Sequence, residues 1–480
     1  MYSDYNISRR NSSISLFGNV DRVALGLYVA IVLIGVLSIT SASFDPETTN
    51  IFSFSHNYMK QLMWVGISWT MATVVLLLDR RLFHMFAYPA YVLGILLLIS
   101  TLVFGTRVNG AKAWFEIGSI RIQPVEFVKI AVSLMMARIM SDYAFNIKRL
   151  VDLVKIAVVI LLPFGIIVLQ NDTGSGLVLG AFLFVMYREG LSKYLYFPII
   201  FTIVLFVAAL ILQPTVIFLA LLVMFTLYSI FKSGELIGHL RFFFGILLGW
   251  LLLSTLTPLS GYVSLMIVCG VAVVVLAGLA IKTRTMMLLW PIAMFFYAMV
   301  FVPTADTLFE HLEPHQKNRL LTFVGLVDDP RDVGYNVNQS KIAIGSGGVF
   351  GKGFMQGTQI KYDYVPEKHT DFIFCIVGEE WGFLGAAVVV LLYVSLILRL
   401  MKMGERQEEP FGRIYSYCVA SILLFHVLVN IGMTVGLMPV MGIPLPFLSY
   451  GGSSLVAFTI LVFIAIRLDA SPRNGLMHVR

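Results

Sequence analysis

Long apolar runs, separated by short polar connections, make up most of the chain. Runs such as VALGLYVAIVLIGVLSIT (residues 23–40) and AAVVVLLYVSLIL (386–398) recur along its whole length. A membrane-spanning helix needs about 20 apolar residues. Strands of a membrane barrel would alternate apolar and polar positions, and these runs do not. The pattern predicts an all-α fold, a polytopic membrane helix bundle whose helices satisfy their own backbone hydrogen bonds.

Fourteen stretches have the length and composition of membrane spans. The short connections within 195–231 and 241–281 suit either a loop or a kink. The predicted spans are 23–43, 60–78, 82–104, 124–141, 151–170, 174–190, 195–212, 214–231, 241–257, 261–281, 285–303, 371–398, 413–437 and 449–467.

Basic residues fall in every second short connection. The net charge is +7, and 58% of the residues are hydrophobic. An excess of Lys and Arg marks cytoplasmic loops, so both termini are expected in the cytoplasm, and this distribution argues against nucleic acid as a partner. Four polar connections then face outward: 44–59, 105–123, 304–370 and 438–448. The basic positions include Arg80, Lys148, Arg188, Lys232, Lys282 and Arg399.

The connection 304–370, about 67 residues, is far longer than any other. Loops beyond about 15 residues are usually functional or disordered. This one carries the stretch VDDPRDVGYN, in which Asp328, Asp329 and Asp332 lie within five positions. It also keeps apolar residues such as Phe323 and Phe350, so it is expected to pack against the mouth of the bundle.

Motifs of soluble enzymes fail on inspection. GGVFGKG (347–353) resembles a phosphate-binding loop, but its glycine spacing is one residue short and Gly353 replaces the required Ser or Thr. The aspartates do not follow the ligand rhythm of a calcium-binding EF-hand. The three cysteines lie inside apolar runs and are interpreted as packing residues.

Charged residues at membrane depth are the main functional signal, because they usually face a cavity or a partner. Glu126 and Lys129 have the i,i+3 spacing of a pair on one helix face; the pair suits either a structural salt bridge or a wall of a substrate cavity. Asp172 suits either a helix cap or the same cavity. Of Glu379 and Glu380, at least one is expected to point inward.

Other candidates lie near the predicted outer ends of spans. Trp114 suits either an interfacial belt or contact with a sugar or lipid. Asp371, which opens a span beside His369, suits a first-turn charge or a site residue. The stretch 437–455, with three prolines and no charge, predicts a rigid, broken-helix lining beside a membrane cavity. A lipid-linked anionic substrate fits these features, and the residues alone allow an enzyme or a transporter.

At these residues the sequence resembles the SEDS family (shape, elongation, division and sporulation) of RodA/FtsW-type peptidoglycan polymerases. The resemblance covers roughly 20–190 and 285–468, and the IAIGSGGVFGKG and GTQ stretches are more similar to the RodA branch than to the FtsW branch. The motifs that carry it are NGAKAWFEIGSIRIQPVEFVK, HQKNRLLTF, DDPRDVGYNVNQSKIAIGSGGVFGKG, VPEKHTDFIF, GEEWGFLG and LMPVMGIPLPFLSYGGSS.

The resemblance implies a glycosyltransferase that polymerises lipid II at the outer face of the bacterial cytoplasmic membrane and releases undecaprenyl pyrophosphate. It makes Asp329, five residues before Gly334, the general base. A divalent cation (Mg or Mn) could assist, with no organic cofactor. The implied partners are undecaprenyl-linked glycan, a class B penicillin-binding transpeptidase and other membrane proteins of the elongation complex. The implied substrate-binding residues are Trp114, Arg121, Gln123, Glu126, Lys129, Asp172, Arg319, His369 and Asp371.

Three departures from the family pattern stand out. Val125 replaces the usual Ser, Asn171 stands where Pro often precedes Asp172, and about four spans are added to the usual ten. The expected organisation is an N-terminal tail (1–22), a first part of the membrane core (23–190), inserted helices (191–284), a second part containing the outer loop (285–468) and a C-terminal tail (469–480). A lipid II flippase, a division-specific FtsW-like polymerase and a non-catalytic scaffold are the alternative hypotheses.

Overall fold

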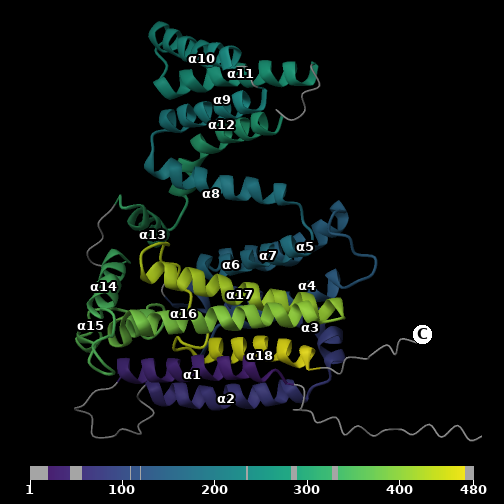
Figure 1. Cartoon of the computed structure of the whole chain (residues 1–480), viewed down its shortest axis with the longest axis vertical. Coiled ribbons are helices and arrows are strands. Elements are labelled where there is room, and N and C mark those ends of the chain that lie inside the picture. The colour runs from purple at the N-terminus through teal and green to yellow at the C-terminus, as the bar shows by residue number, and fades with distance from the viewer. Residues whose placement is uncertain are drawn as a thin grey trace, which may run out of the picture. The chain divides into compact units, whose positions relative to one another are not determined.

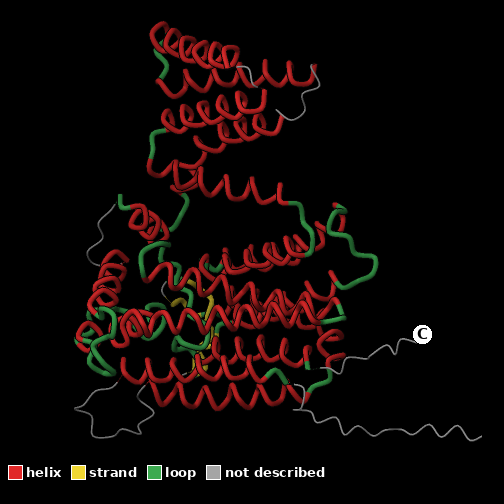
Figure 2. The backbone as a smooth tube through the Cα atoms, viewed as in Figure 1, coloured by secondary structure: helices red, strands yellow, loops and turns green. Residues whose placement is uncertain are grey.

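The structure is a computed structural model that describes residues 20–43, 57–108, 110–118, 120–233, 236–282, 289–326 and 333–470. The chain divides into two compact units. Unit 1 contains the chain up to Leu191 and from Arg331 onward, and unit 2 is Ser192–Pro330. Helices dominate both units, and among the described residues strands occur only in one short stretch (Figures 1 and 2).

Unit 1 holds the first and last spans of the chain. In it α16 packs on α1 and α17, α18 packs on α2, and α4 packs on α3 and α17. Its elements are α1 (Arg22–Ser43), α2 (Asn57–Leu77), α3 (Arg80–Phe104), β1 (Thr106–Val108), β2 (Ala111–Ile117), β3 (Ile120–Ile122), α4 (Pro124–Met140), α5 (Leu150–Leu169), α6 (Thr173–Val178), η1 (Leu179–Ala181), α7 (Phe182–Arg188), α14 (Val333–Ser346), α15 (Thr358–Lys361), α16 (Phe374–Arg406), α17 (Pro410–Thr434) and α18 (Gly452–Asp469).

Unit 2 is built around an apolar cluster that includes Phe218, Leu265 and Phe295. Large apolar side chains such as Phe231 and Leu256 also cover its outer surface, as in helices that face lipid on one side and protein on the other. The helix α12, predicted from sequence as part of the second core segment, packs against α8, α9 and α11 of this unit. The elements are η2 (Lys193–Leu195), α8 (Tyr196–Ile211), α9 (Pro214–Ser233), α10 (Leu236–Leu256), α11 (Gly261–Lys282), α12 (Leu289–Glu310) and α13 (Pro314–Val324).

Each of the fourteen predicted spans coincides with a helix or a helix series. Eleven helices of the described residues are long and apolar enough to cross a membrane. The other three predicted spans are shorter: α4 has 17 residues, and the apolar stretches at Thr173–Arg188 and Leu289–Ala305 fall below the length of the eleven. The prediction of a polytopic membrane helix bundle is confirmed.

A small antiparallel sheet, β1–β2–β3, occupies the predicted polar connection 105–123. Trp114 on β2 pairs with Thr106 on β1, and Glu116 pairs with Arg121 on β3. Gly110 (φ 87°) and Gly118 (φ 65°) supply the positive φ values of the connections, which glycine adopts at little cost. The sheet packs on α3, α4 and α18, so it fixes a segment that the sequence predicted only as a loop.

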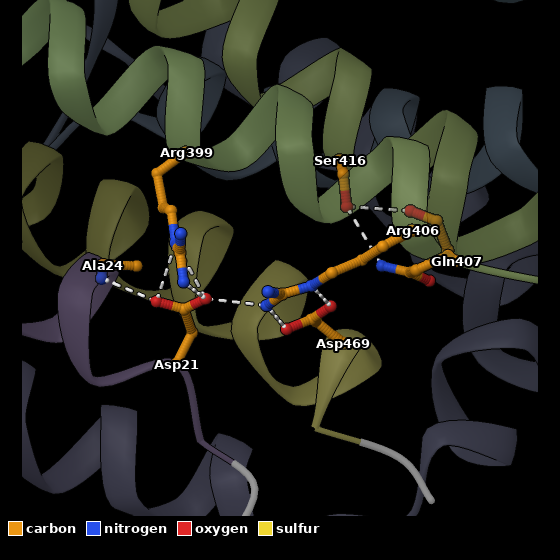
Figure 3. Close-up of polar contacts among 8 residues, drawn as sticks. Asp21, Ala24, Arg399, Arg406, Gln407, Ser416 and Asp469 are labelled. Carbon is orange, nitrogen blue, oxygen red and sulfur yellow. Dashed lines mark hydrogen bonds and ion pairs between the residues drawn. The ribbon is translucent and has the colours of Figure 1, made fainter. Parts of the chain in front are cut away.

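An ion cluster joins the first residues before α1 to the ends of α16 and α18 (Figure 3). Asp21 accepts from Arg399 at 2.8 Å and from Arg406 at 2.6 Å. Arg406 also pairs with Asp469 through a 2.6 Å hydrogen bond from Nε. The Asp21 side chain is 1% exposed. Burial raises the pKa of Asp21, but hydrogen bonds from Arg399, the Ala24 amide and Arg406 outweigh burial and hold this pKa below its ordinary value.

Replacing Asp21 with asparagine is expected to lower the free energy of unfolding by about 2 kcal/mol at neutral pH, as for other hydrogen bonds to charged groups. Because the folded-state pKa lies below the ordinary 3.8, the contribution is present above that pH and is lost as the pH falls through the folded pKa. Thermal unfolding of both proteins in one detergent at a series of pH values measures it. A difference that grows as the solution becomes more acidic would contradict the assignment.

Candidate functional site

The polar core of unit 1 is a buried pair on α4. Glu126 Oε2 and Lys129 Nζ lie 2.8 Å apart, and each side chain is 2% exposed. Lys129 Nζ also lies 3.0 Å from Nε2 of His426 on α17 and 4.6 Å from the centre of the Phe458 ring on α18. The pair predicted from i,i+3 spacing is therefore formed, and two further helices close around it.

The partners of His426 define its tautomer. A charged Lys129 can only donate, so Nε2 of His426 must accept. Nδ1 of His426 lies 3.0 Å from the Pro444 carbonyl oxygen, which can only accept, and Nδ1 therefore carries the proton. The neutral imidazole links the buried ammonium of Lys129 to the backbone of the 438–451 segment.

A second polar group lies where α4 and α6 begin. Gln123 Nε2 donates to Asp172 Oδ2 at 2.9 Å, and Asp172 Oδ1 accepts from the Ser175 amide as the N-cap of α6. The backbone amide nitrogen of Gln123 lies 3.4 Å from Ser453 Oγ on α18. Asp172 thus serves as the helix cap of α6 and also contacts Gln123 at the entrance of α4. Its alternative role, in the wall of a substrate cavity, stays a prediction.

The non-helical segment 438–451 is held by buried side chains. Its carbonyl oxygens at Ile443 and Pro446 accept from Asn430 Nδ2 at 2.8 Å and Tyr393 Oη at 2.5 Å. Non-helical backbone at membrane depth is tolerated only where protein or water satisfies it, and these contacts do so. A Cβ on Gly174 would lie 2.0 Å from the Met441 oxygen. This segment therefore lies directly against the start of α6.

His369 contacts the same segment directly, and Asp371 is linked to it through Asn430 on α17. The Tyr450 amide donates to the His369 carbonyl at 2.8 Å, and Asn430 Nδ2 donates to the Asp371 carbonyl at 2.9 Å. Burial, together with the Lys368 charge, lowers the pKa of His369, so its imidazole is neutral at pH 7. Its buried Nδ1 has no hydrogen-bond partner among the described residues and can bind a ligand.

The remaining predicted residues have separate places. Trp114 and Arg121 lie on the sheet, and Arg121, 61% exposed, pairs with Glu116 at 2.6 Å. The Lys112 amide on β2 donates to the Gln170 carbonyl at 2.8 Å, which ties the sheet to the end where Gln123 and Asp172 meet. Arg319 lies on α13 in unit 2. Asp329, with Asp328 and Asp332, lies outside the described residues, and its role stays a prediction.

The sequence did not predict how α16 is broken. Gly382 has φ 64° and ψ −162° inside the helix, and the stretch 347–353 pairs with the break through backbone bonds. Lys352 N donates to the Glu379 carbonyl at 3.0 Å, and Phe383 N donates to the Gly348 carbonyl at 2.9 Å. The glycines of GGVFGKG, rejected as a phosphate-binding loop, thus serve close packing of two backbones. Two glycine-rich stretches about 30 residues apart were the only sequence signal for it.

Gly382→Ala is expected to destabilise the protein by at least about 2 kcal/mol, because its backbone conformation is essentially restricted to glycine. The added Cβ would also lie 2.3 Å from the Gly351 amide nitrogen. Gly345→Ala in α14 is the matched control, since its Cβ would meet nothing within 4 Å. Thermal unfolding of both variants measures the difference, and equal stability would contradict this account of the break.

The described residues contain no group of three or more His, Cys, Asp or Glu side chains placed to hold a metal ion. The divalent cation that the sequence analysis allowed stays a prediction. Two lysines near residues 358–363 are ion-paired: Lys368 Nζ lies 2.6 Å from Asp363, and Lys352 Nζ lies 2.6 Å from Glu379.

Comparison with known families gives a match over almost the whole chain. The family described as cell cycle protein, which groups FtsW, RodA and SpoVE, matches residues 21–231 and 205–474. The peptidoglycan glycosyltransferase RodA of Treponema pallidum is 33% identical over 453 residues, which cover 94% of this chain and 97% of the relative. The peptidoglycan glycosyltransferase MrdB of Escherichia coli is 31% identical over 392 residues, 82% of this chain and 80% of the relative.

Solved structures agree with this match. A chain from a structure described as "Structural coordination of polymerization and crosslinking by a peptidoglycan synthase complex" is 26% identical, with a TM-score of 0.60 and coverage of 94% of this chain and 97% of that chain. RodA of Thermus thermophilus, a rod shape determining protein, is 23% identical, with a TM-score of 0.54 and coverage of 94% and 96%. The second likeness supports the fold alone.

Proposed function

The chain belongs to the cell cycle protein family of FtsW, RodA and SpoVE, and from this premise we propose that it polymerises lipid II into β-1,4 glycan strands for cell elongation. It is a multi-pass membrane protein and a peptidoglycan glycosyltransferase, as its relatives RodA and MrdB are named. The assignment rests on the similarity to those relatives over most of the chain. The helix bundle supports it, because its polar residues contact one another within unit 1.

The polar end of unit 1 suits a lipid-linked anionic substrate. The lipid chain can lie along the apolar outer faces of the bundle, while the head group meets Gln123, Asp172 and His369. His369 Nδ1, buried and without a partner among the described residues, is available to bind a sugar hydroxyl or a phosphate oxygen. Arg121 lies exposed on the sheet and pairs with Glu116 at 2.6 Å; it can meet an anionic group only by exchanging that partner.

In the proposed reaction Asp329 accepts the proton of the acceptor sugar 4-hydroxyl. The oxygen then attacks the anomeric carbon of the donor, and the bond from that carbon to the pyrophosphate oxygen breaks. The configuration inverts from the α-linked pyrophosphate to a β-1,4 linkage, through an oxocarbenium-like transition state as in other glycosyl chemistry. Undecaprenyl pyrophosphate leaves with its negative charge, which basic side chains stabilise.

The orientation and partners follow from the same proposal. The excess of Lys and Arg in alternate connections supports cytoplasmic termini, and in the proposed orientation the 304–370 connection lies outside the bacterial cytoplasmic membrane. Because the peptidoglycan synthase complex with a similar chain couples polymerization to crosslinking, a class B penicillin-binding transpeptidase is the proposed partner. A divalent cation also stays a proposal, and loss of glycan synthesis on chelation with recovery on adding Mg²⁺ or Mn²⁺ would support it.

Reconstitution into vesicles that contain fluorescent lipid II separates the polymerase from the flippase hypothesis. A polymerase converts the label into high-mass glycan, whereas a flippase moves unchanged lipid II across the bilayer. Glycan from the purified chain, alone or with its transpeptidase, supports the proposal. Transfer of label between leaflets with no new product would favour the flippase.

A further inference from the structure

A buried carboxylate outside the polar core holds a large part of the 304–370 connection. Glu379 on α16 is 0% exposed, and its carboxylate accepts from five donors. They are Ser346 Oγ at 3.5 Å, Lys352 Nζ at 2.6 Å, Thr358 Oγ1 at 3.2 Å, the Gln359 amide at 3.0 Å and the Ile360 amide at 3.2 Å.

All five donors come from residues 346–360. The carboxylate therefore does not stabilise its own helix. It binds the end of α14, the Lys352 side chain and the first residues of α15. Lys352 Nζ also lies 2.8 Å from Thr358 Oγ1, and a Cβ on Gly357 would lie 2.9 Å from Glu379 Oε2. The Gly357 backbone therefore packs directly against the Glu379 carboxylate.

Two further contacts hold α14 against α16 and α17 within unit 1. Ser340 Oγ donates to the Thr434 carbonyl of α17 at 3.0 Å, and a Cβ on Gly378 would lie 2.8 Å from Ile344. Ile344 thus packs against Gly378 of α16, the residue that precedes Glu379. In the sequence α14 begins four residues after Asp329, so its position bears directly on where the preceding residues can reach.

We propose that Glu379 is a positioning residue for glycan polymerisation, which locks α14 and residues 346–361 onto the break in α16. This inference rests on the proposed polymerase function. The carboxylate is enclosed by donors from the chain itself, and we assign it an action through the two helices that it holds. A displacement of about 1 Å at a reacting group can lower a rate by about 10²-fold, so release of the lock should lower kcat. KM should stay near its wild-type value, because Gln123 keeps its hydrogen bond to Asp172 and His369 keeps its hydrogen bond from the Tyr450 amide.

The test compares full-length Glu379→Gln with Glu367→Gln as a matched control. Glutamine keeps the shape of Glu379, but its amide group cannot accept from Lys352 and the backbone amides together. Glu367 belongs to the same connection, and its carboxylate accepts from Thr370 Oγ1 at 2.9 Å at an exposed position. Lipid II polymerisation gives kcat and KM, and hydrogen exchange in detergent follows the amides of α14 and of residues 358–361.

The expected result for Glu379→Gln is an approximately 10²-fold lower kcat, a KM within about threefold of wild type and faster exchange in both segments. The control should change neither quantity. Polymerisation by Glu379→Gln within twofold of wild type would overturn the proposal, and so would a loss confined to KM.

If Glu379→Gln does not accumulate in the membrane, Lys352→Met is the variant to test. A roughly tenfold lower kcat is expected for Lys352→Met, and an unchanged kcat would contradict the proposal. A wild-type protein that makes no glycan contradicts the proposed function instead, and the exchange data then show whether the lock exists by itself.

Discussion

Asp329→Ala is expected to abolish glycan synthesis while the protein still folds and inserts in the membrane. Transfer of a proton by a general base typically contributes about 10²–10⁴-fold to a rate, and alanine cannot accept the proton of the attacking hydroxyl. Residual activity should therefore fall by at least about 10²-fold. Glycan formed from purified lipid II, separated on gels, is the measurement, with thermal unfolding as the check on folding.

Asp328→Ala and Asp332→Ala are the controls for this prediction, because they remove a carboxylate from the same short stretch. The proposed mechanism assigns no proton transfer to either residue, so both should keep most of the activity. Full activity of Asp329→Ala, together with loss in one of the two controls, would move the base to that position. Loss in all three would indicate a collective electrostatic role of the stretch.

Lys129→Met is expected to produce the largest loss of stability. It leaves Glu126 as a buried carboxylate without its ammonium partner, and breaking a buried ion pair in this way costs about 3–5 kcal/mol. The hydrogen bond to His426 is lost as well, and with it the link to the Pro444 carbonyl. The apparent unfolding temperature should fall, and glycan synthesis should fall with it because three helices of the polar core lose their common contact.

The chain offers a matched control for this pair on α5. Lys155 and Asp152 have the same i,i+3 spacing and the same 2.8 Å separation, but the Lys155 side chain is 57% exposed. The Asp152 side chain is 9% exposed, but it keeps the hydrogen bond from the Asn146 amide at 3.2 Å when Lys155 is replaced. Lys155→Met should therefore cost clearly less stability than Lys129→Met. The double variant Glu126→Gln with Lys129→Met should recover much of the loss, since no unpaired charge stays buried. Equal effects at Lys129 and Lys155 would contradict the account of the buried pair.

Local patterns in the sequence predicted the fold well. The apolar runs predicted the helices, because a bilayer imposes a minimum length on each span. The pair Glu126–Lys129 was predicted because its spacing lies within one helix. The three-residue strands β1 and β3 were missed, since they are too short to show an alternating pattern.

Contacts between distant segments could not be predicted in the same way. Lys129 and His426 are 297 positions apart, and no local sequence pattern links two residues at that separation. The role of Glu379 was missed because its partners come from a connection whose path depends on the break at Gly382. The family resemblance named the polar positions, and the structure shows which of them touch. Asp329, which the resemblance predicts as the general base, lies outside the described residues. The variants above test that prediction.

The most direct test of the polymerase assignment is the balance of products from purified wild-type protein and lipid II. We predict one undecaprenyl pyrophosphate released for each sugar linkage formed, and glycan chains that an enzyme specific for β-1,4 linkages digests completely. Recovery of unchanged lipid II, even with the partner transpeptidase and a divalent cation present, would contradict the assignment.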